Sequence, residues 1–208
     1  MKPLIIRASA LGDIMAPAKK AGELSAGAKT FIRRSFKESL FGYRDIVSTK
    51  PMQKGIQCEQ ESIDLLNAVQ GTAYVKNTER RTFEDMLTGE CDIDAGDSIG
   101  DIKSSWSLGT FPIWPDEAEN TGYEWQLRAY MLLWDRPAAW VAYCMVNTPE
   151  ALIGYENREM HIVDHIPADM RVTRVDYKRD AEKESAMIER IKLAQAYYSQ
   201  LENDYFGF

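Results

Sequence analysis

The nine-residue run "AAWVAYCMV", Ala138–Val146, restricts the possible folds more than any other part of the chain. It is apolar throughout, rich in residues that favour strands, and enclosed by Pro137 and Pro149. Its length suits a strand and is far below the roughly 20 residues of a membrane span. A strand without polar positions has both faces buried. The run therefore predicts a central strand in a sheet covered on both sides.

Helical patterns supply the covering layers. In residues 25–42, Ser25 is a candidate cap, apolar residues recur at Ile32, Phe36 and Leu40, and Gly42 ends the pattern. A second helix is predicted for 54–71, with Ile56, Ile63, Leu65, Leu66 and Val69 as its buried stripe, and others for 123–134 and 180–206. Strands or extended segments are predicted for 3–9, 73–89, 160–166 and 170–177. This order predicts an α/β fold with a mixed central β-sheet flanked by helices.

Chain length and charge add two expectations. The 208 residues predict a single domain, with a basic helical N-terminal portion 1–54 and a C-terminal helix 180–206. The net charge of −7 divides into +7 for residues 1–54 and −14 for the rest. A basic portion on an acidic body indicates a negatively charged partner at one face. Ordinary variation of charge along a chain, with Arg33, Arg34 and Lys37 on a solvated helix face, is the alternative.

The three cysteines exclude some classes of site. Cys58, Cys91 and Cys144 lie far apart and form no CxxC pair, which argues against a disulfide framework and a cysteine-based zinc or iron–sulfur site. The N-terminal segment has no signal-peptide pattern, and no phosphate-binding glycine loop indicates ATP. A reduced, cytoplasmic protein with no membrane association is expected.

An acidic segment, residues 90–103, has the pattern of a β-hairpin. Polar and apolar residues alternate, so Glu90, Asp92 and Asp94 share one face of a strand. A two-residue turn at 96–97 pairs positions whose numbers sum to 193. In that register Asp92 faces Asp101, and Glu90 faces Lys103.

Two carboxylates opposite one another repel, because their Cβ atoms are about 5 Å apart. A bound cation between Asp92 and Asp101 would relieve that repulsion, and oxygen ligands without His or Cys favour Mg²⁺ or Mn²⁺. Protonated Lys103 cannot be a ligand, but it can orient or deprotonate a water or neutralise charge on a phosphate. A hairpin whose carboxylates simply face solvent is the alternative.

Four motifs occur in the order found in a known superfamily. They are "KGIQCEQE" with Gly55 and Glu59, "TGECDI" with Asp92, "GDIKSS" with Asp101 and Lys103, and "QLRAY" with Gln126 and Tyr130. "RASALGDIM", with Ser9, is a weaker fifth. With these motifs the chain resembles the PD-(D/E)XK nucleases, and within them the RecB-like and λ-exonuclease-like (YqaJ-type) branch.

The resemblance implies a restriction-endonuclease-like core and a metal-dependent deoxyribonuclease, most simply a phage or prophage exonuclease that processes duplex DNA ends for recombination. It implies that Glu59, Asp92, Asp101 and the Ile102 carbonyl hold Mg²⁺ or Mn²⁺, and that Lys103 and Gln126 position the attacking water. It also implies a ring-shaped homo-oligomer and a single-strand annealing protein as partners. Residues expected to bind DNA are Tyr130, Ser9, Arg7, Ser104, Arg33 and Arg34. A structure-specific or restriction-type endonuclease and a non-catalytic DNA-binding descendant are the alternatives.

Overall fold

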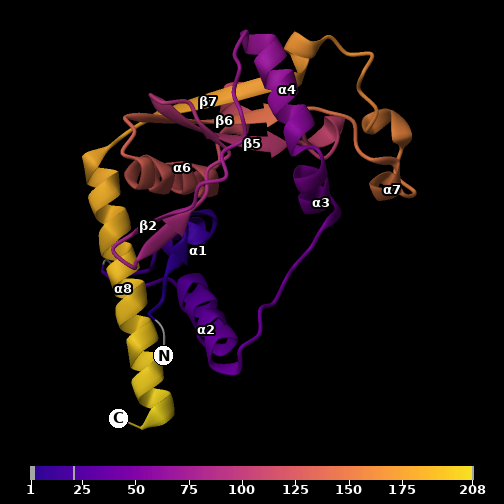
Figure 1. The fold of residues 1–208 in the computed structure, drawn as a ribbon. Coiled ribbons are helices and arrows are strands. Elements are labelled where there is room, and N and C mark those ends of the chain that lie inside the picture. The colour runs from indigo at the N-terminus through magenta and orange to yellow at the C-terminus, as the bar shows by residue number, and fades with distance from the viewer. Residues whose placement is uncertain (1–2, 21, 208) are drawn as a thin grey trace.

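A computed structural model describes residues 3–20 and 22–207, and in it the chain forms two mixed sheets with helices on both sides (Figure 1). The fold is α/β, as the sequence predicts. The strands, however, divide between two sheets instead of one. The four-stranded sheet has the order β4 (Ile93–Asp94), β5 (Ser98–Ser104), β6 (Ala138–Cys144), β7 (Val172–Lys178). The three-stranded sheet has the order β1 (Ile6–Arg7), β3 (Leu87–Gly89), β2 (Arg81–Phe83).

Strand β6 is the buried central strand that the apolar run predicts. It pairs in parallel with β5 and antiparallel with β7, and residues 139–142 are fully buried. Trp140 on β6 requires a glycine beside it: a Cβ on Gly100 of β5 would lie 2.2 Å from the indole ring. The pairing of β5 with β6 therefore depends on glycine at position 100.

Two helices cover opposite faces of this sheet (Figure 1). Helix α6 (Thr121–Trp134) connects β5 to β6 and packs on both strands, while α4 (Glu59–Gln70) packs on them from the other side. Each helix contributes to a separate hydrophobic cluster, the α6 cluster including Leu127 and the α4 cluster including Leu66. The catalytic candidates on β5 thus lie within a layered core.

The remaining helices complete the frame. Helix α2 (Ala26–Phe41) begins and ends as predicted, because Ser25 accepts a hydrogen bond from the Ala28 amide and Gly42 adopts a φ of 67°. The long helix α8 (Ala181–Phe206) runs along one edge of the molecule and packs against α2 (Figure 1). The shorter helices are α1 (Leu11–Met15), α3 (Lys50–Gln57), α5 (Pro115–Ala118), α7 (Glu150–Ile153) and four 3-10 turns (Ala8–Ala10, Leu108–Thr110, Arg158–Met160, Ala168–Arg171).

Two predictions about local structure are wrong. The single helix expected for 54–71 is interrupted at Cys58, which ends α3 and precedes α4, and Ile56 is 77% exposed instead of buried. The α3 side chain that is fully buried is Lys54. Residues 160–166 form turns instead of a strand, because the backbone amides of residues 160, 161, 162 and 166 donate to carbonyls three or four residues earlier in the chain.

Within the described residues, no helix is both long enough and apolar enough to cross a bilayer.

Candidate active site

The acidic hairpin has the register that the sequence predicts. Ile93 pairs with Gly100 and Asp94 with Ile99, so opposed positions sum to 193. The Ala95 amide donates to the Ser98 carbonyl at 3.0 Å, which closes the turn. Strand pairing begins only at Ile93, so Asp92 lies in a bend just before β4. There its Oδ2 accepts a hydrogen bond from the Ile102 amide at 2.6 Å.

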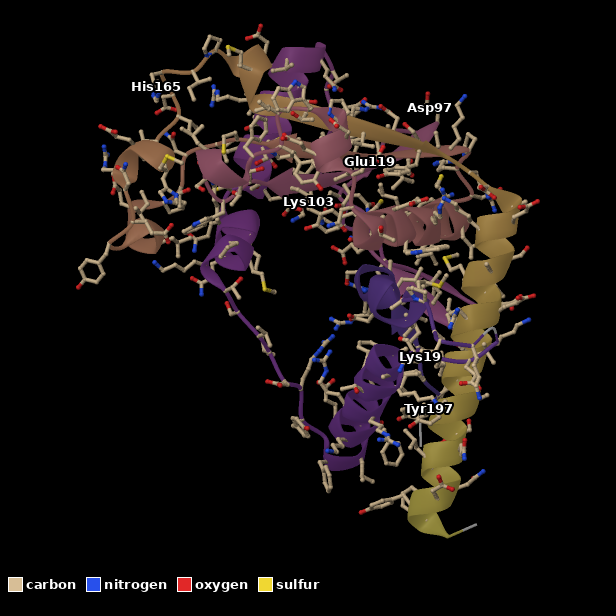
Figure 2. The ribbon with its side chains drawn as sticks, turned by 180° about the vertical axis from the view of Figure 1, so that it is seen from behind. Lys19, Asp97, Lys103, Glu119, His165 and Tyr197 are labelled. Carbon is tan, nitrogen blue, oxygen red and sulfur yellow. The ribbon has the colours of Figure 1, made fainter. Side chains whose placement is uncertain are left out.

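Asp101 is the best-enclosed of the candidate carboxylates, with 2% of its surface exposed. Gln126 Nε2, from α6, donates to its Oδ1 at 3.0 Å. Lys103 Nζ lies 2.6 Å from its Oδ2, yet this oxygen accepts no hydrogen bond of good geometry. The Lys103 ammonium also lies 4.5 Å from the centre of the Tyr123 ring. Figure 2 shows Lys103 below the four-stranded sheet, between α3 and α6.

The electrostatics of this group differ from those of ordinary surface residues. Burial, and then the neighbouring Asp101, raise the pKa of Asp92 to about 8. Burial on its own would lower the pKa of Lys103, but the ion pair with Asp101 raises it above its usual range. The pocket therefore holds one carboxylate that resists ionisation beside an amine that stays protonated.

These groups line one open pocket of about 660 Å³. Its walls come from α3 and α4 on one side, β5 in the middle and α6 on the other. The structure brings together eight of the residues predicted for the site, namely Glu59, Asp92, Asp101, Ile102, Lys103, Ser104, Gln126 and Tyr130.

Two of these residues, Tyr130 and Ser104, form hydrogen bonds with other groups of the protein. The Tyr130 hydroxyl accepts from Gln126 Nε2 at 2.9 Å and donates to the Glu90 carbonyl at 2.9 Å. Ser104 and Ser62 share a hydrogen bond between their hydroxyls at 2.8 Å. Gln126 donates to both Asp101 and Tyr130, so its geometry suits holding Asp101 in place.

The donor set fits a small, hard cation. Asp101 Oδ2 is buried without a hydrogen bond, and the raised pKa of Asp92 shows that the site disfavours a second negative charge. A divalent ion would relieve both, and oxygen donors suit Mg²⁺ or Mn²⁺. In residues 3–20 and 22–207, no group of three or more His, Cys, Asp or Glu side chains is arranged to hold a metal. The protein would therefore supply only part of the coordination, as is usual for Mg²⁺.

Glu59 is the third candidate acid, but its carboxylate does not join those of Asp92 and Asp101. Its carboxylate forms an ion pair with Lys76, which lies in the extended segment before β2. Glu59 nevertheless lines the pocket and contributes to raising the pKa of Asp92. If Lys76 bonded to another group, the Glu59 carboxylate would be free to bind a ligand in the site.

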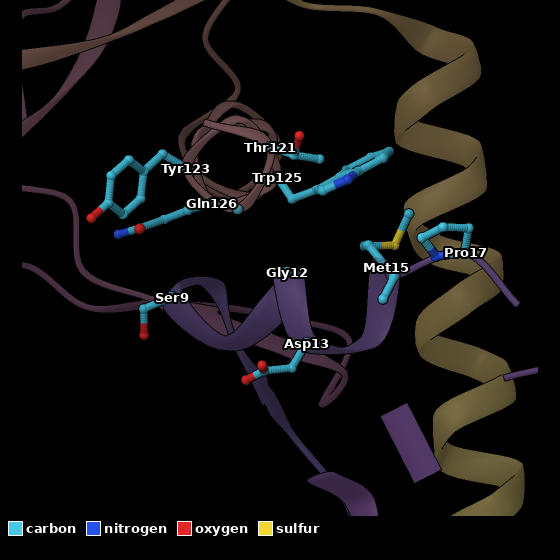
Figure 3. A pocket seen from close by; sticks show the side chains of 11 residues that line it. Ser9, Gly12, Asp13, Met15, Pro17, Thr121, Tyr123, Trp125 and Gln126 are labelled. Carbon is cyan, nitrogen blue, oxygen red and sulfur yellow. The ribbon is translucent and has the colours of Figure 1, made fainter. Parts of the chain in front are cut away.

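Ser9 lies at the edge of the site. A neighbouring pocket of about 520 Å³ lies between α1 and α6, and Tyr123 and Gln126 line both pockets. Figure 3 shows Ser9, Tyr123 and Gln126 at one end of it, and Trp125, Met15 and Pro17 at the other. The polar end therefore adjoins the carboxylates.

The basic residues separate into two groups. Arg7 and Arg34 line a third pocket, beside α2. Arg33 instead donates to the Tyr197 hydroxyl of α8 at 2.8 Å, so the structure does not bring it to the same place. The predicted pairing of Glu90 with Lys103 is also wrong, because the ladder ends before Glu90 and its carboxylate bonds to Arg80.

Sequence reasoning missed three residues of the site. Tyr123 lies three positions before Gln126 on α6, so helical spacing alone could have placed both on one face. Lys76 gave no signal, because its segment has no periodic pattern. Lys54 is fully buried and donates to the carbonyls of Ser105, Trp106 and Val146, which ties α3 to the ends of β5 and β6.

Comparison with solved structures identifies relatives of this chain and proteins that share its fold. No protein-family model and no curated protein sequence matches the chain. Among solved structures, a phage-related exonuclease from Haemophilus somnus 129PT is 37% identical, with a TM-score of 0.91 over 98% of this chain and 97% of that one. An alkaline exonuclease from Laribacter hongkongensis, LHK-Exo, is 16% identical, with a TM-score of 0.71 over 98% and 91%. LHK-Exo in complex with dAMP has a TM-score of 0.64 at 19% identity over 96% and 89%, and at these identities the two LHK-Exo structures show the shared fold alone.

Proposed function

The chain belongs to the same family as the phage-related exonuclease of Haemophilus somnus, and from this premise we propose that it is a metal-dependent exonuclease that degrades DNA from duplex ends. The observation that supports the chemistry is the joining of Asp92, Asp101 and Lys103 in one pocket. This arrangement matches the acid-acid-lysine site of the PD-(D/E)XK nucleases, which we propose as its superfamily.

Each residue receives a role from its contacts. Asp92 and Asp101 would hold Mg²⁺ or Mn²⁺, with Glu59 and the Ile102 carbonyl as further oxygen donors, and when bound the ion supplies Lewis acidity to the scissile phosphate. Lys103 stays protonated because of Asp101, so its ammonium orients the attacking water and neutralises charge that develops on the phosphate oxygens.

Gln126 and Tyr130 act through other groups. The Gln126 amide holds Asp101 by a hydrogen bond, and the Tyr130 hydroxyl holds Gln126 in turn. This chain of contacts runs from the backbone at Glu90 to the catalytic carboxylate. Ser9 and Ser104, at the edge and floor of the site, are the hydroxyl donors proposed for substrate phosphates.

Binding to DNA is proposed to use basic residues of the N-terminal portion, among them Arg7, Arg33 and Arg34. Phosphate contacts of this kind weaken steeply as salt concentration rises. A ring-shaped homo-oligomer and a single-strand annealing protein remain proposals that follow from the family resemblance.

Incubation with end-labelled linear duplex DNA and with closed circular DNA tests the proposal, each with Mg²⁺ and with EDTA. We expect the linear DNA alone to be degraded, and only with Mg²⁺. Cleavage of the circular DNA would identify an endonuclease instead. Binding without any cleavage would identify a non-catalytic descendant.

A matched pair of lysine variants locates the chemistry. Lys103→Ala should lose cleavage, because the Lys103 ammonium lies beside the Asp101 carboxylate, where the reaction is proposed to take place. The variant should still bind DNA. Lys192→Ala, which removes an exposed lysine of α8 outside the basic N-terminal portion, should cut at the wild-type rate. Cleavage by Lys103→Ala at the wild-type rate would show that the site is elsewhere.

A further inference from the structure

The third pocket, beside α2, has a volume of about 810 Å³ and lies next to the catalytic one. Arg7 of β1, Arg34 of α2 and Arg44 of the segment between α2 and α3 line it, and we call it the arginine pocket. Figure 1 shows this segment running as an extended connection from the end of α2 to α3. Met52 of α3 lines both pockets, so the two are neighbours at that helix.

The arginine pocket carries positive charge that the protein does not neutralise. In the described part of the chain, Arg7, Arg34 and Arg44 form no ion pair with a carboxylate, although Glu38 and Asp45 also line the pocket. Arginines elsewhere, such as those at positions 81, 136 and 179, are paired.

Arg7, Arg34 and Arg44 line the same pocket, so their positive charges lie near one another. Burial, followed by repulsion from Arg44, Arg80 and Arg34, lowers the pKa of Arg7, while Glu38 acts in the opposite direction. A polyanion bound in the pocket would relieve that repulsion.

Apolar and aromatic side chains are exposed in the same pocket. Tyr43, Ile46, Val47 and Met52 line it and are exposed by 49%, 79%, 61% and 52%. A duplex presents mainly its phosphates and sugars to a protein surface, so it would leave these side chains unused. A single strand presents phosphates to arginines and base faces to aromatic rings at once.

We infer that the arginine pocket binds a single strand of DNA, with phosphates on Arg7, Arg34 and Arg44 and a base stacked on Tyr43. This inference rests on the proposed function, because Met52 connects the pocket with the site where a strand would be cut. The pocket is then a subsite for nucleotides of that strand on the side of α3. Binding of the strand and its cleavage at the carboxylates then take place in separate pockets.

Binding of a fluorescein-labelled single-stranded oligonucleotide to the full chain, measured by anisotropy in EDTA across a salt series, tests the inference. Tyr43→Ala should weaken single-strand binding about 5- to 100-fold and duplex binding less, because it removes base stacking. Arg44→Gln should reduce the slope of log affinity against log salt by about 0.7, the value for one single-strand phosphate contact.

Arg158→Gln is the charge-matched control. Arg158 is exposed and paired with Glu150 at α7, away from both pockets, so its loss should leave the affinity and the salt slope unchanged. Unchanged single-strand affinity and slope in both Tyr43→Ala and Arg44→Gln would overturn the inference. The inference would also be overturned if Tyr43→Ala changed only the molar mass measured by sedimentation. The surface would then be a contact between two copies of the chain.

Cleavage assays on the same proteins keep the two proposals apart. If wild-type protein fails to cut DNA but its single-strand affinity still depends on Tyr43 and Arg44, the proposed function is wrong and the single-strand subsite stands. If it cuts linear DNA while the variants bind single strands normally, the proposed function stands and the subsite is wrong.

Discussion

Asp92 and Asp94 lie two residues apart on the same arm of one hairpin, yet their surroundings are opposite. Asp92 lies beside Asp101, and burial raises its pKa to about 8. Burial also acts to raise the pKa of Asp94, but Arg136 and the Gly96 amide outweigh it, so that pKa is lowered. One carboxylate is held where ionisation is unfavourable, while the other is neutralised by its own protein.

This difference in surroundings indicates which acidic residue of the hairpin is suited to bind a cation. The ion pair of Asp94 with Arg136 satisfies both its oxygens and leaves no site for a ligand. Asp92 faces a pocket with only one hydrogen bond to protein. A carboxylate that the fold buries without neutralising is the better candidate for holding an external cation.

The largest effect expected from this comparison is on cleavage. Asp92→Asn should lower the rate of DNA hydrolysis by at least about 10²-fold, because it removes charge from a carboxylate proposed to hold the metal ion that stabilises the transition state. Asp94→Asn should leave the rate unchanged, because that side chain bonds to Arg136. Single-turnover cleavage of linear duplex DNA measures both, and equal losses would erase the distinction between the two aspartates.

The next largest effect is expected on the free energy of unfolding when Lys54 is replaced. Its buried ammonium group donates hydrogen bonds to backbone carbonyls. Lys54→Met should lower the free energy of unfolding by several kcal/mol, since the buried carbonyls of Ser105 and Val146 each lose their donor at about 1–3 kcal/mol. Urea denaturation measures the change. Little loss of stability would mean that water replaces the ammonium group without cost.

The raised pKa of Asp92 predicts a pH dependence in the metal-free protein. A carboxyl group whose pKa is higher when folded stabilises the fold fully below its unfolded pKa of about 4, and this contribution is lost as pH rises toward about 8. In EDTA, wild type should therefore lose more stability between pH 5 and 8 than Asp92→Asn does. Mg²⁺ should restore it at pH 8 by binding the folded state.

Urea denaturation at both pH values, with and without Mg²⁺, measures that dependence. Asp94 acts in the opposite direction, because its pKa is lowered in the folded state and its contribution is lost as pH falls. Identical pH profiles of wild type and Asp92→Asn in EDTA would contradict the assigned environment of Asp92.

The smallest effect is expected at the ion pair that neutralises Asp94. Arg136→Gln should lower the free energy of unfolding by about 1 kcal/mol at neutral pH, since both partners are only partly exposed. Its cleavage rate should equal that of wild type. The exposed pair of Arg158 with Glu150 serves as a control whose loss should change stability less.

Much of the local structure followed from pattern. The apolar run at 138–146 identified the central strand, and Ser25 with Gly42 marked the ends of α2, because caps and hydrophobic periodicity act over a few residues. The turn at Gly96 defined the register of the hairpin, and Asp92, just outside the ladder, lines the same pocket as Asp101. These features depend on neighbours in sequence, so they can be derived without a tertiary structure.

Other features depended on contacts between distant segments. Lys54 is buried because carbonyls from the ends of β5 and β6 surround it, and no local pattern announces such partners. Glu59 meets Lys76 for the same reason. The interruption at Cys58 turned Ile56 to solvent, although helical periodicity assigned it to the core.

The amino-acid order alone determined the layered α/β class, the hairpin and the identity of its facing carboxylates, since alternation and turn chemistry are short-range properties. Only the tertiary structure decided which carboxylates remain without a neutralising partner, and which arginines gather beside the candidate active site. Charge neutralisation and desolvation depend on every segment that packs around a group, and those segments come from distant parts of the chain.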